Sequence, residues 1–172
     1  MHNKLRSILL LGLFIALEVI LTRFLSVESP IVRISFEFIP IAVSAILFGP
    51  VMAGIGAAAA DVLGMLIFPK GAFFPGFTLS AFISGLIYGI FLYKKKITLA
   101  RTFAAVLTVI VICSLFLNTI WLIILTKNGA YAILTARLIK CAVFLPVQTF
   151  MIYFVWKYVG NLFTRSLNLE KQ

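Results

Sequence analysis

The chain has 172 residues, of which 63% are hydrophobic and 12% charged, and its mean hydropathy is +1.16. A water-soluble chain carries about a quarter charged residues, so the composition excludes a soluble domain. It indicates one all-α integral membrane domain over residues 1–172. The net charge of +10 does not indicate nucleic-acid binding, because most cations flank apolar spans, where anionic headgroups explain them.

The first apolar runs predict a long helix, an extended loop and a short helix. A helix needs about 20 apolar residues to cross the bilayer, and Ser7 to about Leu25 satisfies this. The polar segment Ser26–Glu37 alternates with period two from Val32, which indicates extended chain. The second helix, Phe38–Phe48, has only 11 residues and covers roughly half of the hydrocarbon thickness.

Four more helices follow, which makes six in total. A tight turn is expected at Gly49-Pro50, and Pro146 is expected to kink the last helix. The predicted ranges are Val51–Phe68, Phe74 to about Tyr93, Phe103–Leu125 and about Ala130–Leu162.

The distribution of cations predicts the orientation. With six helices, nine cations fall on one side, which the positive-inside rule assigns to the cytoplasm together with both termini. They are Lys4, Arg6, Lys94, Lys95, Lys96, Arg101, Lys157, Arg165 and Lys171. The other six lie at the outer side: Arg23, Arg33, Lys70, Lys127, Arg137 and Lys140.

The outer cations predict an anionic ligand that enters from outside, because topology selection normally removes cations from that side. Arg23, Lys70 and Arg137 are the candidates for binding a ligand carboxylate, and bidentate pairing favours the two arginines. The alternative is that these side chains snorkel to outer headgroups or pair with Glu28 and Glu37.

Rings and polar groups near these cations predict an aromatic ligand. Phe73, Phe74 and Phe77 lie close to Lys70 and would stack on a planar ligand; an interfacial aromatic girdle is the alternative. Asn118 and Trp121 suit an aromatic, hydrogen-bonding ligand, or else join helices.

Asp61 lies about 16 Å along the third helix, near mid-membrane. An ionisable group there needs a partner, which leaves an ion pair, a ligand heterocycle or a proton-linked role open.

Small residues four apart permit close helix approach. Gly54 and Ala58 on the third helix predict internal packing. Gly12 and Ala16 on the first helix predict either internal packing or an exposed stripe on which another membrane protein docks.

Enzymatic and cofactor signatures are missing from the sequence. It contains no GxxxxGK[ST], HExxH or GxSxG pattern, and one His with distant Cys113 and Cys141 predicts neither a zinc site nor a disulfide. We therefore expect no enzyme, cofactor or metal. A small intramembrane enzyme acting on lipid phosphates through Asp61, or a purely structural partner protein, stays as an alternative from another class.

Four segments carry a resemblance that covers essentially the whole chain. They are Arg33-Ile-Ser-Phe-Glu-Phe-Ile-Pro-Ile, Gly49-Pro50, Phe73-Phe-Pro-Gly-Phe-Thr-Leu-Ser-Ala and Leu117-Asn-Thr-Ile-Trp-Leu. With six helices and a short second one, the sequence resembles the folate-specific S components, the substrate-binding membrane subunits of energy-coupling factor (ECF) vitamin transporters.

The resemblance implies a function. Such subunits of the prokaryotic cell membrane bind a vitamin from outside under capping loops 1–2 and 3–4. They dock through helix one on a transmembrane coupling protein driven by two ATPases, and topple to release the vitamin inside. The resemblance adds Arg33, Thr78 and Ser80 to the expected folate site. The usual Ala-xxx-Ala docking motif corresponds here to Gly12-xxx-Ala16. Another anionic vitamin, such as pantothenate, is the alternative substrate.

Overall fold

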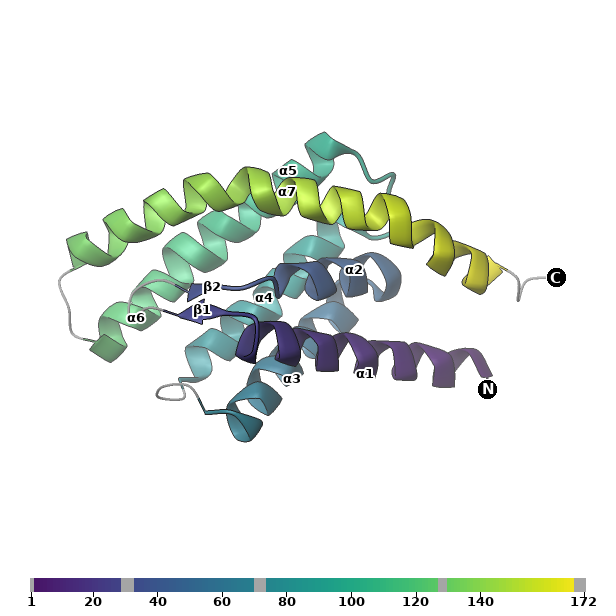
Figure 1. Ribbon diagram of the computed structural model, residues 1–172, viewed down its shortest axis with the longest axis horizontal. Coiled ribbons are helices and arrows are strands. Elements are labelled where there is room, and N and C mark those ends of the chain that lie inside the picture. Colours follow the sequence, from purple (N-terminus) through teal and green to yellow (C-terminus); the bar gives the residue numbers. More distant parts are fainter. Residues whose placement is uncertain (1, 29–32, 70–73, 127–129, 169–172) are drawn as a thin grey trace.

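The computed structural model describes residues 2–28, 33–69, 74–126 and 130–168, with side chains described for 7–26, 35–69, 74–125, 134–135 and 137–160. The described residues form six helical rods and one pair of two-residue strands (Figure 1). The rods are α1 (His2–Arg23), α2 (Phe38–Phe48), α3 (Pro50–Ile67), α4 (Pro75–Leu92), the continuous α5–η1–α6 (Leu99–Val109, Ile110–Leu117, Asn118–Thr126) and α7 (Ala130–Asn168). The strands β1 (Val27–Glu28) and β2 (Arg33–Ile34) pair antiparallel.

The lengths of the apolar helices fit a membrane protein. Among the described residues, four helical stretches are long and apolar enough to cross a bilayer: Pro50–Ile67, Pro75–Leu92, Leu99–Leu125 and Arg137–Gly160. The short α2 is apolar too, and eight of its 11 residues are buried. The start of α1 and the end of α7 lie at the same end of the molecule (Figure 1).

The predicted helices are confirmed, with some changes at their ends. The bounds of α2 agree with the prediction, and α3 and α4 each begin at a proline, a residue suited to the first helical position. The fifth helix begins at Leu99 instead of Phe103, because the Thr98 side chain accepts a hydrogen bond from the Arg101 amide (3.3 Å) and caps the helix. The first helix ends at Arg23 instead of Leu25.

The backbones of α3 and α4 are in direct contact, and glycine makes this possible. A Cβ atom added at Gly89 would lie 2.2 Å from Pro50 Cα, and one at Gly85 would lie 2.7 Å from the Ala53 carbonyl. Gly54 similarly faces the Phe82 carbonyl oxygen at 2.9 Å. The packing role predicted for Gly54 is therefore confirmed.

Helix α1 packs on α3 with one face and leaves its small residues on another. A Cβ atom at Gly56 of α3 would meet the Leu11 side chain at 3.3 Å, so this glycine makes room for α1. Nothing lies within 4 Å of a Cβ atom at Gly12, and Ala16 is exposed. The small-residue stripe of α1 therefore belongs to the outer surface of the described structure.

The last two rods show features that bear on the site. The segment η1 is a π-helix of eight residues between α5 and α6. Helix α7 arches across the molecule (Figure 1) and stays helical through Pro146. Cys113 and Cys141 are both buried free thiols.

Candidate functional site

The rings of Phe74 and Trp121 pack against each other at the first turn of α4 and form an aromatic wall. Their ring centroids are 5.5 Å apart, and Phe77 stands edge-on to Phe74 at 6.2 Å. A Cβ atom at Gly76 would lie 2.5 Å from Phe74 Cε1 and 2.6 Å from Trp121 Cδ2. Since no side chain fits there, Gly76 is what allows the two rings to meet against α4.

Hydrogen bonds fix the orientation of the indole. Trp121 Nε1 donates to Ser80 Oγ (3.1 Å), and Ser80 Oγ donates to the carbonyl of Gly76 (3.1 Å). Ser80 is 3% exposed, and a hydrogen bond at a buried hydroxyl directs a side chain more strongly than one in water. We refer to Phe74, Phe77, Ser80 and Trp121 as the aromatic group.

Asn118 and Arg137 carry polar atoms on α6 and α7. Arg137 Nη1 donates to the carbonyl of Ser114 in the π-helix (2.6 Å), a bond that joins α7 to η1. The Oδ1 atom of Asn118 and the Nε atom of Arg137 are enclosed without a hydrogen-bond partner in the part of the chain that the structure describes. Buried polar atoms of this kind are rare and call for an explanation.

Arg23 and Asp61 lie elsewhere, along α3, which packs against both α1 and α4. Arg23 is 6% exposed, and its Nε atom would lie 2.8 Å from a Cβ atom at Gly64 of α3. Asp61, one turn earlier on α3, accepts a hydrogen bond from Thr78 Oγ1 of α4 (2.7 Å). We refer to Arg23, Asp61, Gly64 and Thr78 as the α1–α3 junction.

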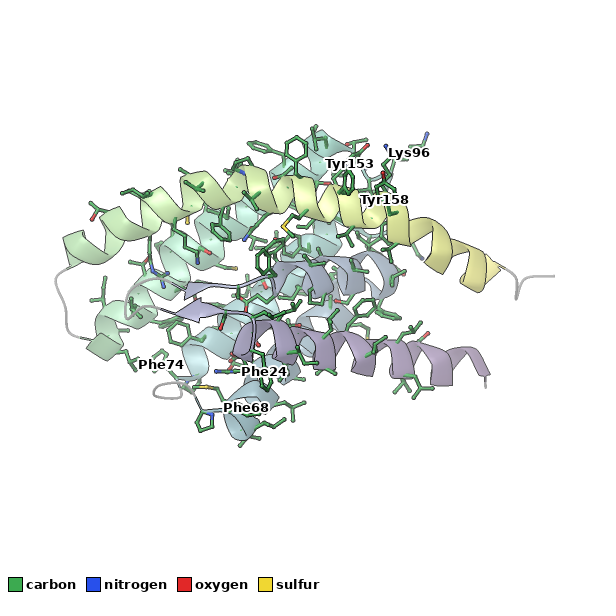
Figure 2. The ribbon with its side chains drawn as sticks, in the orientation of Figure 1. Phe24, Phe68, Phe74, Lys96, Tyr153 and Tyr158 are labelled. Atoms are coloured by element: carbon green, nitrogen blue, oxygen red, sulfur yellow. The ribbon has the colours of Figure 1, made fainter. Side chains whose placement is uncertain are left out.

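Rings cover the end of the α1–α3 junction. Phe24 and Phe68 lie next to one another (Figure 2), with ring centroids 4.8 Å apart and an interplanar angle of 76°. Phe24 follows Arg23 at the end of α1, and Phe68 is the C-cap of α3. This edge-to-face pair joins the ends of the two helices.

The predicted site residues therefore form two sets on opposite faces of α4. Gly76 and Ser80 both face Trp121 and are four residues apart, which places them on one side of the helix. Thr78 lies two residues from each, or about 200° around the helix axis, and it faces Asp61. The aromatic group and the α1–α3 junction are separated by the α4 backbone.

Some predicted residues cannot be placed. Lys70 and Phe73 lie outside the described residues, and so does Lys127. For Arg33 only the backbone, in β2, is described. No group of three or more metal-ligating side chains occurs among the described residues. The sequence-based prediction missed two residues, Gly76 and Ser114. The position of Gly76 one turn before Ser80 could have indicated its role, whereas no sequence signal indicated Ser114.

Comparison with known proteins identifies the family. A family model described as "ECF-type riboflavin transporter, S component" matches residues 2–160. The chain belongs to this family of S components. The S component is a transporter subunit and not an enzyme, and its apolar helices make it a multi-pass membrane protein.

Individual relatives carry a different vitamin in their names. The S component is 48% identical to "Folate transporter FolT" of Clostridium novyi (strain NT) over 160 residues, 93% of each chain. It is 35% identical over 156 residues to a protein of the same name from Leuconostoc mesenteroides, covering 87% of this chain and 84% of the relative. It also matches the "Crystal structure of FolT bound with folic acid" with a TM-score of 0.84 and 44% identity, over 87% of this chain and 92% of that one.

Proposed function

We propose that this S component binds folate and is the substrate-specificity subunit of an ATP-driven ECF importer. The observation that carries the proposal is the 48% identity, over 93% of both chains, to a protein named as a folate transporter. The likeness to a structure with folic acid bound supports it. The family description names riboflavin, so riboflavin is the substrate against which folate has to be tested.

We infer that folate lies on the side of α4 that carries the aromatic group. Folate consists of a flat pterin ring, a benzoyl ring and a glutamate with two carboxylates. Phe74 and Trp121 offer ring faces and edges to the flat part of such a ligand, and Asn118 and Arg137 offer polar atoms beside them. The rings match the flat part of the vitamin, and the polar atoms match its hydrogen-bonding groups.

The remaining predicted contacts belong to the rim of the site. Arg33, Lys70 and Phe73 would cap the ligand from loops 1–2 and 3–4, and Phe77 would reach it from the first turn of α4. Arg23, Asp61 and Thr78 would reach it only if it extends over the end of α4 toward α3. The bond between Thr78 and Asp61 supports a role for this pair in holding α3 against α4.

The wider arrangement is also part of the proposal. Residues 1–172 form one domain in a prokaryotic plasma membrane, with both termini in the cytoplasm, which the positive-inside rule supports. The partners are a transmembrane coupling protein and two ATPase subunits. Toppling of the S component in the membrane would then release folate inside.

The purified protein is expected to bind one folic acid molecule per chain without ATP. Isothermal titration calorimetry measures the stoichiometry and affinity directly. Folic acid should bind at least about 100-fold more tightly than riboflavin, because a site that pairs with polar groups of one ligand rejects a ligand that lacks them. Tight binding of riboflavin, or saturation by neither vitamin, would make the folate assignment wrong.

The α1 stripe is expected to serve docking and not folate binding. Replacing Gly12 and Ala16 by leucine fills an exposed face and should leave folate affinity unchanged in detergent. Uptake of labelled folate by proteoliposomes that contain the complete transporter should fall more than about tenfold, because small residues are what permit close helix approach.

The control for this experiment is Ala142→Leu, a matched change at an exposed position of α7. It should leave both folate binding and uptake unchanged. Equal loss of uptake in Ala142→Leu, or full uptake by the Gly12 and Ala16 variant, would argue against docking through α1.

A further inference from the structure

We propose that Asn118 and Arg137 recognise the lactam edge of the pterin ring, where a ring N–H lies beside a carbonyl oxygen. The inference rests on the proposed function, since it assigns one part of folate to one part of the site. It also distinguishes two roles for Arg137, recognition of the pterin ring and binding of a glutamate carboxylate. The positive charge alone would suggest the carboxylate.

The position of the Arg137 guanidinium follows from the π-helix. In a π-helix the carbonyls bond five residues ahead instead of four. In η1 the carbonyl of Ser114 also accepts from side chains, namely Arg137 Nη1 at 2.6 Å and Thr119 Oγ1 at 3.4 Å. This contact holds the guanidinium against η1 and leaves the Nε–H donor enclosed without an acceptor among the described residues.

Asn118 supplies the opposite group from the turn where η1 passes into α6. It directly precedes Thr119, whose Oγ1 donates to the same Ser114 carbonyl that Arg137 contacts. Its Oδ1 atom is enclosed and accepts no hydrogen bond from any described residue. The two helices therefore hold one unused donor and one unused acceptor in enclosed positions, and leaving either unpaired after ligand binding would be costly.

A lactam edge complements this pair, whereas a carboxylate does not. The ring N–H would donate to Asn118 Oδ1, and the carbonyl oxygen would accept from Arg137 Nε. A carboxylate can only accept, so it would satisfy Arg137 but bring a negative oxygen toward Asn118 Oδ1. Trp121, three residues after Asn118, lies on the same side of α6 and gives the flat heterocycle a ring to pack against.

Three probes distinguish the parts of the ligand. Folic acid carries the lactam edge and the glutamate. Pteroic acid keeps the lactam edge but lacks the glutamate. Aminopterin keeps the glutamate but has an amino group in place of the carbonyl and no hydrogen on the adjacent ring nitrogen, so donor and acceptor are exchanged.

The wild-type protein is expected to bind aminopterin at least about tenfold more weakly than folic acid, because both contacts are inverted. In Arg137→Met and in Asn118→Leu, the affinity for folic acid and for pteroic acid should fall together. The preference for folic acid over aminopterin should shrink to within about threefold. Lys157→Met, which removes an exposed cation of the same helix, should keep the wild-type preference.

Two results would overturn the inference. If Arg137→Met weakens folic acid and aminopterin equally and spares pteroic acid, the arginine binds a glutamate carboxylate. If the wild-type protein binds aminopterin as tightly as folic acid, no lactam edge is recognised. This measurement uses the wild-type protein alone, so it does not depend on whether a variant folds. A protein that binds none of the three probes would instead contradict the proposed folate function itself.

Discussion

Replacing Gly76 by alanine is expected to lower the affinity for folic acid about 10- to 100-fold. The added Cβ atom would lie 2.5 Å from Phe74 Cε1 and 2.6 Å from Trp121 Cδ2, so the indole has to move. Such overpacking typically costs about 1–3 kcal/mol. Trp121 would also lose its bond to Ser80, so the aromatic wall would no longer have the shape that the ligand meets.

The measurement combines calorimetry with indole fluorescence. In a Trp156→Phe background, Trp121 is the only tryptophan, so a shift of its emission in the unliganded Gly76→Ala protein reports the displacement. Gly12→Ala is the matched control, because it adds the same methyl group in open space. Unchanged emission and unchanged affinity in Gly76→Ala would show that the rings do not define the site.

Replacing Gly89 by alanine is expected to destabilise the fold more than the same change at Gly12 or Gly160. The Cβ atom would lie 2.2 Å from Pro50 Cα and 2.5 Å from Pro50 N. These are backbone atoms of α3 that cannot move as a flexible side chain does, so α3 and α4 have to separate. The expected loss is about 3 kcal/mol, at the upper end of overpacking effects.

Thermal unfolding of the unliganded protein in detergent checks this expectation. Gly89→Ala should lower the midpoint by several degrees, while Gly12→Ala leaves it unchanged. Gly160→Ala is an intermediate case, because its Cβ atom would meet the Trp156 side chain at 2.8 Å and a side chain can yield. Equal midpoints for Gly89→Ala and Gly12→Ala would mean that α3 and α4 do not touch as described.

The elements of the fold were largely predictable from apolar run lengths and from Pro and Gly. The bounds of α2 follow from polar Glu37 on one side and Gly49-Pro50 on the other. The π-helix was not predictable, because nothing in the composition of Ile110–Leu117 distinguishes it from an ordinary apolar helix. A side-chain contact from α7, between Arg137 and the Ser114 carbonyl, accompanies it and depends on the tertiary structure.

The candidate site was predictable as a set of residue types but not as a geometry. Phe74 and Trp121 were expected to serve one ligand, and they are in contact. Asp61 was grouped with them, yet it lies on α3 and accepts a hydrogen bond from Thr78 on the opposite side of α4. Residues two apart on a helix diverge by about 200°, so the separation of Thr78 from Ser80 was available from the sequence. The partner of Asp61 was not, because it depends on the register between α3 and α4.

The contact between Gly85, Gly89 and the α3 backbone has a mechanical consequence. Two helices whose backbones are in contact cannot slide or rotate against each other without losing that contact. Helices α3 and α4 therefore move as one rigid unit. We therefore expect the opening that frees a bound vitamin on the facing side, where the π-helix η1 and the curved α7 meet through the Arg137–Ser114 bond.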